Sequence, residues 1–242
     1  LGGSITTSGT QDYEGAITLS ANTTLISTGA AITASTIDGA YDLTITAGAA
    51  QSLTSAIGDT TPLTSINVST TSGNLTLGED ITVTGTNAMI FNAGSSTAAG
   101  TSTGGNIIIS GSPNFTTGSG GRVTYYTGSV SGSTGLTSLI GSATHRFRYN
   151  SDETTTNYSA ALSSGKYAIY REQPTLTITA ASETVTYGTA AAESVTITGM
   201  QNGDASGTVV TTAASISIAG SNVGDHTITP SDAASMYGYG FS

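Results

Sequence analysis

The sequence predicts an all-β protein: a parallel β-helix (solenoid) followed by an immunoglobulin-like antiparallel β-sandwich. Three observations support this fold class. Short segments alternate apolar residues with threonine, charged residues make up only 8% of the 242 residues, and 32 glycines punctuate the chain. Because side chains alternate along a strand, such segments place their apolar residues on one face. Threonine, isoleucine and valine favour strands, and glycine supplies turns.

The first half of the chain repeats one alternating segment. Its clearest form is Asp42–Gly48 (DLTITAG), and variants occur at Ala16–Leu19, Ser65–Val68, Asn74–Gly78 and Ile81–Gly85. The step from Ile17 to Leu43 is 26 residues, and the step from Leu43 to Ile66 is 23. Two or three short strands in about 20–26 residues suit one solenoid coil, which buries its inward residues when the next coil stacks on it. An antiparallel sandwich is the alternative, but the repetition favours a solenoid over residues 1–165.

The middle of the chain changes in composition. Gly94–Gly121 is the stretch richest in glycine, serine and threonine, and Ala93–Gly105 is expected to form a protruding loop. Within the stretch, Asn106–Ser110 contains three consecutive isoleucines and is expected to be a strand that is buried on both faces or nearly so.

All five basic residues and six of the eleven tyrosines then fall between positions 122 and 171. This window predicts a junction, whose cations can pair with Asp152, Glu153 and Glu172. Aromatic and arginine side chains are also enriched at interfaces. The candidate interaction surface for a glycan or a protein comprises Tyr125, Tyr126, Arg146, Arg148, Tyr149, Tyr167 and Tyr170. Packing between two domains is the simpler explanation of the same residues.

Residues 166–242 are expected to form the sandwich. Gln173-Pro174 marks a break, since the residue before proline favours an extended conformation. About six alternating strands follow, with turn signals at Gln201–Asp204 and Gly220–Gly224. These strands are Thr175–Ala180, Glu183–Gly188, Ser194–Gly199, Gly207–Thr211, Ser215–Ile218 and His226–Pro230.

Composition also excludes some functions. A formal charge of −10 argues against nucleic-acid binding, which requires a basic surface. No apolar run approaches the length of about 20 residues that spans a membrane. The absence of cysteine suits a chain that is stabilised by stacking rather than by disulfides. A start at Leu1-Gly2-Gly3, without methionine, is expected for a piece of a longer protein.

Several segments resemble filamentous-haemagglutinin-like adhesins, the two-partner secreted surface proteins of Gram-negative bacteria. The most distinctive is Arg146–Glu172 (RFRYNSDETTTNYSAALSSGKYAIYRE), which is similar to the junction before their MBG/YDG-type β-domains. The repeat-like segments are Gln11–Thr24, Thr36–Thr46 and Gly58–Val68, and those similar to the β-domain are Leu176–Tyr187 and Met200–Asp204. Tyr237–Ser242 matches the point just before the last strand of such domains, which we therefore expect to be missing.

The resemblance implies an extracellular protein at the bacterial cell surface or in its matrix. It would be exported through an outer-membrane transporter and would form a rod. Its partners would be neighbouring domains, further copies of itself in a filament, or glycans. The family carries no catalytic residues, so no catalytic, cofactor or metal site is transferred to this chain.

The residues themselves offer little chemistry. His145 and His226 lie far apart in sequence, with no hydrolase-type serine elbow and no cysteine to complete a zinc site. Paired carboxylates at Glu79-Asp80 or Asp152-Glu153 are the serious enzymatic alternative, because polysaccharide cleavage uses two acids. Solvated carboxylates explain them more simply, and the same holds for an ice-binding array of Thr-x-Thr segments. A covalent crosslink of Lys166 to Asn150 or Asn157, with Glu153 as the catalytic acid, is a further hypothesis, and a cation of the junction paired with an acid explains Lys166 more simply. We expect a non-enzymatic structural or adhesive segment, with a glycan-binding or polysaccharide-active solenoid as the alternative.

Overall fold

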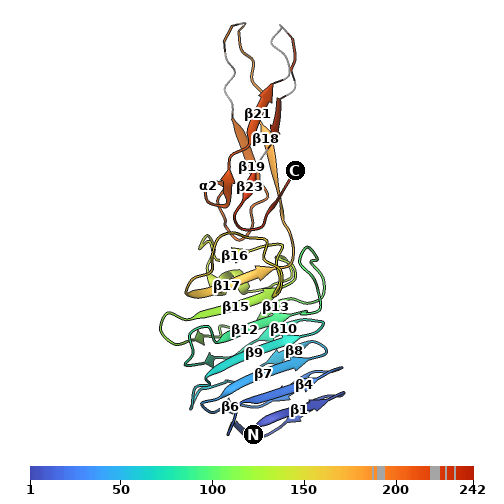
Figure 1. Cartoon of the computed structure of the whole chain (residues 1–242), viewed down its shortest axis with the longest axis vertical. Coiled ribbons are helices and arrows are strands. Elements are labelled where there is room, and N and C mark those ends of the chain that lie inside the picture. Colours follow the sequence, from blue (N-terminus) through green and yellow to red (C-terminus); the bar gives the residue numbers. More distant parts are fainter. Residues whose placement is uncertain (187, 190–193, 219–223, 227, 232) are drawn as a thin grey trace.

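The computed structural model describes residues 1–186, 188–189, 194–218, 224–226, 228–231 and 233–242. The described chain is mainly β-strand, as expected, and carries two short helices, α1 (Leu136–Ile140) and α2 (Ser206–Val209). Its largest element is a parallel sheet of eight strands that fills the lower part of Figure 1. In spatial order the strands are β1 (Gly3–Thr7), β4 (Thr23–Ser27), β7 (Asp42–Ala47), β9 (Ser65–Thr70), β12 (Met89–Ala93), β15 (Arg122–Thr127), β17 (Gly165–Tyr170) and β16 (Phe147–Arg148).

Two further sets of parallel strands accompany this sheet. One contains β2 (Gln11–Tyr13) with β5 (Ile32–Ala34), and β8 (Gln51–Leu53) with β10 (Leu75–Leu77) and β13 (Ile107–Ile109). The other contains β3 (Ile17–Thr18) with β6 (Ile37–Asp38), and β11 (Ile81–Thr82) with β14 (Phe115–Thr116), the two pairs being joined through bridges at Ile57. From β1 to β15 the chain visits the large sheet, then the first set, then the second set, and returns.

The register confirms one expected repeat and corrects the other. Leu43 pairs with Ile66, as the 23-residue step predicts. Ile17, however, pairs with Ile37 in a different sheet, and the partners of Leu43 in the large sheet are Thr23 and Ile66. The 26-residue step does not join register partners, because the same alternating pattern occurs in all three sets of strands. Similarity of sequence therefore does not reveal which set a segment joins.

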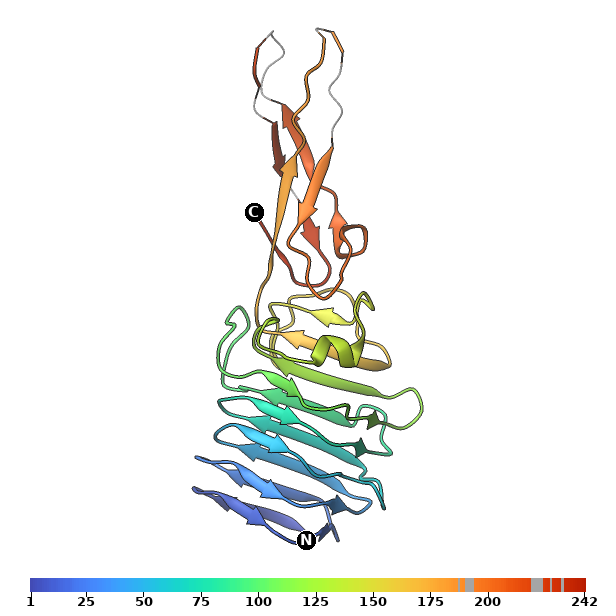
Figure 2. The ribbon, with the colours of Figure 1, turned by 180° about the vertical axis from the view of Figure 1, so that it is seen from behind.

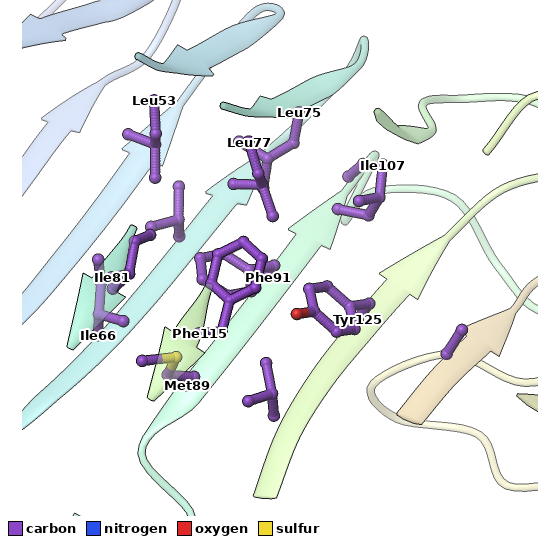
Figure 3. Packing of buried hydrophobic residues seen from close by; sticks show 14 of the residues in the cluster. Leu53, Ile66, Leu75, Leu77, Ile81, Met89, Phe91, Ile107, Phe115 and Tyr125 are labelled. Carbon is purple, nitrogen blue, oxygen red and sulfur yellow. The ribbon is translucent and has the colours of Figure 1, made fainter. Parts of the chain in front are cut away.

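Apolar residues in register form the core of the parallel part. Leu25, Ile45, Val68, Phe91 and Tyr125 occupy one line across five neighbouring strands, and all five are at most 1% exposed. Figure 3 shows Phe91 and Tyr125 beside Phe115, which comes from β14. The Phe91 ring stacks on Tyr125 with the centroids 5.5 Å apart and lies 5.5 Å from Phe115. Burial of such a column is the main favourable term that stacking provides.

Polar side chains connect successive strands at the turns. Asp38 Oδ1 accepts hydrogen bonds from the backbone N–H groups of Thr60 and Thr61, and Asp80 Oδ1 accepts one from Asn114. Buried Gln51 bonds both the N–H and the carbonyl of Ile32 through its side-chain amide. These side chains provide hydrogen-bond partners for backbone groups that would otherwise be unpaired at the turns.

The protruding loop and the isoleucine strand lie where they were expected. β12 ends at Ala93 and β13 begins at Ile107, with no strand between them. Ile107 is fully buried, whereas Ile108 and Ile109 are half-buried. Strand β17 also continues the parallel sheet to Tyr170, beyond the expected boundary at residue 165.

Antiparallel pairs begin after Pro174. β18 (Thr175–Ala180) pairs with β19 (Val195–Thr198), and β21 (Ser215–Ile218) pairs with β22 (Ile228–Ser231). β20 (Val210–Thr212) pairs with β23 (Ala234–Ser235), while β24 (Gly240–Phe241) is parallel to β18. Figures 1 and 2 show this C-terminal unit at one end of the long axis, with the N-terminus at the other.

Three expected strands of the C-terminal unit differ from the structure. Gly207–Thr211 is wrong as a single strand, because helix α2 occupies its first part and β20 its end. Of the expected strand Glu183–Gly188, residues 183–186 form no strand and Gly188 lies in a turn, while Tyr187 lies outside the described residues. Thr227 of the expected segment His226–Pro230 also lies outside them, but β22 covers its end.

Candidate functional site

The candidate site is the junction between the parallel sheet and the C-terminal unit. It contains β15, β16 and β17, the irregular segment 149–164, the loop 200–204 and the tail 235–239. Alternation along β15 and β17 directs Tyr125 and Tyr170 inwards and Tyr126 and Tyr167 outwards. The junction therefore presents tyrosines on both faces of the sheet.

Five of the seven predicted interaction residues are buried. Tyr125, Tyr149 and Tyr170 are fully enclosed, and Tyr167 and Arg148 are at most 5% exposed. Of the set, only Tyr126 and Arg146 are half-buried. The seven residues therefore do not form an open contact face in this chain. Their contacts instead support the second explanation, in which they pack the junction.

Arg148 is the centre of the outward side of the junction. Its guanidinium donates hydrogen bonds to the carbonyls of His145 and Phe147, at 3.0 and 2.8 Å, and to Ala160 at 3.0 Å. The same group lies 4.4 Å from the ring centroid of Tyr237 and within 5.5 Å of those of Tyr158 and Tyr167. Burial lowers the pKa of Arg148, yet cation–π contacts of this kind stabilise a desolvated arginine. Arg148 thus joins the sheet to the tail.

Asp204 is the centre of a second cluster. Its Oδ2 atom accepts hydrogen bonds from the hydroxyls of Tyr149 at 3.2 Å and Tyr239 at 2.8 Å. Its Oδ1 atom lies 3.9 Å from Nδ1 of His145. Burial is the main cause that raises the pKa of Asp204, and burial likewise raises the pKa values of Tyr149 and Tyr239. A buried carboxylate with two hydroxyl donors fixes the position of the loop that carries it.

The loop 200–204 makes further contacts with the parallel part. Asn202 donates from Nδ2 to the Tyr149 hydroxyl at 3.0 Å and accepts a bond from Thr137 of α1 at 2.6 Å. Its carbonyl accepts the N–H of Ala143 at 3.0 Å. Asn202 and Gly203 both have positive φ values, of 52° and 77°, which asparagine and glycine adopt most readily. The expected turn signal Gln201–Asp204 is therefore a docking loop.

Arg171 is a buried residue whose role the sequence did not reveal. It is fully enclosed, and it donates to the carbonyl of Ala93 at 2.7 Å, to Oδ1 of Asn92 and to Glu153 at 3.3 Å. Burial lowers its pKa and Glu153 opposes that effect. The alternation along β17 directs Arg171 to the same outward face as Tyr167, and a residue on that face is ordinarily expected to contact solvent. In the structure the segment 149–164 covers this face and brings Glu153 to Arg171.

The acids of the junction have separate partners. Glu153 pairs with Arg171, as the sequence suggested, whereas Glu172 accepts the N–H of Val130. Asp152 accepts bonds from Thr154, Thr155 and Ala99; burial alone would raise its pKa, but these bonds lower it to about 2. Among the described residues of the junction, Arg171 forms an ion pair with Glu153, whereas Lys166 pairs with neither Asp152 nor Glu153.

Other candidate chemistry does not gather at one place. Asp80 of the Glu79-Asp80 pair holds a turn through Asn114. In the part of the chain that the structure describes, no group of three histidines or acids is placed to hold a metal. One surface hollow is lined by Ile109, Pro113 and Leu139, and another by Ile178, Pro230 and Phe241. No charged side chain lines either hollow. No described helix is both long and apolar enough for a membrane span.

Comparison with family models, curated proteins and solved structures finds no match to this chain.

Proposed function

We propose that this chain is a structural segment of an extracellular bacterial adhesin: a parallel β-solenoid that forms a rod, carrying a β-sandwich at one end. The observation that carries the proposal is the cyclic visit of the chain to three sets of parallel strands, each return adding one strand to the eight-stranded sheet. Each strand that joins the parallel sheet lengthens the stack by about 4.8 Å, the spacing between hydrogen-bonded neighbours. Such a chain gains length in proportion to its number of coils, which is what a spacer requires.

The contacts at the junction favour a mechanical role for the segment. Backbone hydrogen bonds join Tyr149 to Tyr237 and Ser159 to Met236, at 2.8 and 3.0 Å. The side-chain clusters of Arg148 and Asp204 add contacts on both sides of these bonds. A joint that is closed by backbone bonds and buried aromatic groups transmits force and orientation better than a flexible linker does. The C-terminal unit would then extend the rod.

The proposed location rests on composition and on the resemblance of Arg146–Glu172 to adhesin junctions. A chain without cysteine, with few charges and a serine- and threonine-rich exterior, is compatible with export in an unfolded state and with life outside the cell. The partners that we propose are adjoining units of the same adhesin and the transporter that exports it. Self-association into filaments and glycan contacts remain secondary proposals.

The experiment is electron microscopy of the material isolated from its source, together with its intact mass. A structural segment should appear as a thin rod within a larger polypeptide or in an ordered filament. Compact monomers near 24 kDa would contradict the proposal.

An internal deletion tests the coil arrangement. Removal of residues 43–65 joins Asp42 to Ile66, the register partner of Leu43, and should leave a folded rod that is one coil shorter. Removal of residues 43–54 provides the control, because it disrupts the order in which the chain visits the three sets of strands and should abolish cooperative folding. Equal tolerance of both deletions would refute the coil arrangement.

A further inference from the structure

The parallel sheet ends at an edge that would attract another strand. β17 is the last strand that spans the full width of the sheet, and its neighbour β16 pairs with it through only Phe147 and Arg148. An uncovered edge presents unpaired N–H and carbonyl groups, which pair readily with another chain. The chain must therefore satisfy these groups by other means.

The residues on either side of β16 pair with a further part of this edge. Ala168 donates its N–H to the carbonyl of Arg146 at 3.1 Å. The carbonyls of Tyr170 and Glu172 accept the N–H groups of Ser151 at 3.1 Å and Asn150 at 2.9 Å. Asn150 has a φ of 53°, a conformation that a regular strand cannot contain. The backbone therefore pairs with the edge from Ala168 to Glu172 and then turns away, so that it offers no continuous new edge.

The C-terminal tail holds this segment in place. Tyr149 donates its N–H to the carbonyl of Tyr237 at 2.8 Å, and the Arg148 guanidinium lies over the Tyr237 ring. Gly238 approaches so closely that a Cβ atom there would lie 2.2 Å from the Tyr149 carbonyl oxygen. Tyr239 reaches Asp204 beside Tyr149. Figure 2 shows the C-terminal unit seated over this end of the sheet.

We propose that residues 146–151, held by the tail 235–239, form a cap that prevents a second copy of this chain from pairing with the β17 edge. The inference rests on the stacked parallel strands of the proposed function. It assigns the C-terminal unit a second role, that of closing the sheet as well as extending the rod. Opening the cap would expose Ala168, Tyr170 and Glu172 as a template for a strand of another copy.

Two independent variants test the cap, each with a matched control. Gly238→Val places a side chain against the Tyr149 carbonyl. Gly188→Val makes the same change at a similar φ, 88° against 91°, where no atom lies within 4 Å. Arg148→Gln removes the cation from the aromatic cluster, whereas Arg122→Gln makes the same charge change at a half-buried site on β15.

The readouts are amide hydrogen exchange at Ala168 and Ser151, and particle mass as a function of concentration. Both cap variants should exchange these amides at least about tenfold faster than their controls, which corresponds to a loss of about 1.4 kcal/mol, and should form end-to-end dimers or longer rods. Faster exchange without association would overturn the proposal, and so would protection that is unchanged in both variants. Unprotected β7 and β9 amides in the unsubstituted protein would instead show that the stacked strands, and hence the proposed function, are wrong.

Discussion

Replacement of Phe91 by alanine should destabilise the parallel part more than almost any other single change. Phe91 is fully buried and lies in register between Val68 and Tyr125. Burial of a phenylalanine side chain contributes about 2–3 kcal/mol, and each aromatic pair adds about 0.5–1.5 kcal/mol. Phe91 forms two such pairs, with Tyr125 and Phe115. With the cavity that remains, the expected loss in free energy of unfolding is about 3–5 kcal/mol.

Urea unfolding followed by far-UV circular dichroism and tyrosine fluorescence measures this loss. Asn67→Ala is the matched control, because Asn67 is exposed on the outward face of the adjacent strand; its effect should stay within about 0.5 kcal/mol. The midpoint should shift for Phe91→Ala with an unchanged slope. A loss below about 1 kcal/mol, or one equal to that of the control, would refute the inward column of apolar residues.

Three further predictions concern the junction and the turns. Arg171→Ala should lower the free energy of unfolding by about 3–5 kcal/mol, because it leaves Asn92 and the Ala93 carbonyl without their partner. Glu153→Gln should lower it by less than half as much in the same urea assay. Equal losses would contradict the buried network. Asp152 has a pKa of about 2, below its unfolded value of about 3.9, so its stabilisation is present above pH ~4 and is lost as the pH falls through about 2. Hydrogen exchange at Ala99 and Thr155 should accelerate over that range, and Asp152→Asn should remove the dependence; its persistence in that variant would refute the assignment. Gly48→Ala should lower the free energy of unfolding by about 1–3 kcal/mol, because its Cβ would lie 2.3 Å from the Thr28 carbonyl oxygen. Gly9→Ala is the control and should be nearly neutral, since no atom lies within 4 Å of its Cβ position. Equal shifts of the two variants in thermal unfolding would contradict the close approach at Gly48.

The alternating segments predicted most strands of the parallel part because their period is a local property. Leu43, Ile45, Ile66 and Val68 are buried as alternation requires. Assignment of a segment to one of three sets of strands is not local, since it depends on the residues between the segments. For this reason the similarity of the segments at Ile17 and Leu43 does not reveal that Ile17 pairs with Ile37.

The composition of the junction pointed to residues that meet there in the structure, but it did not reveal their environment. Tyr167 and Arg148 have outward parity on their strands, and such residues ordinarily face solvent. They are buried because the segment 149–164 and the tail 235–239 cover that face, through contacts that span many residues in sequence. Arg171 is hidden for the same reason. A local sequence pattern does not show that a distant segment covers one face of a strand. The sequence could therefore predict that these residues pack at a junction, but not which of them are buried.

The stacking of parallel strands in a fixed register is the central claim, and one engineered disulfide tests it most directly. The hydroxyl oxygens of Thr46 and Ser69 lie 3.3 Å apart on adjacent strands, and the chain has no cysteine of its own. The variant Thr46→Cys/Ser69→Cys should therefore form an intramolecular disulfide on mild oxidation, as intact mass and peptide mapping would show. Thr46→Cys/Asn67→Cys, which is out of register, should remain reduced. Equal oxidation of both variants, or crosslinking only in the second, would contradict the register and with it the rod.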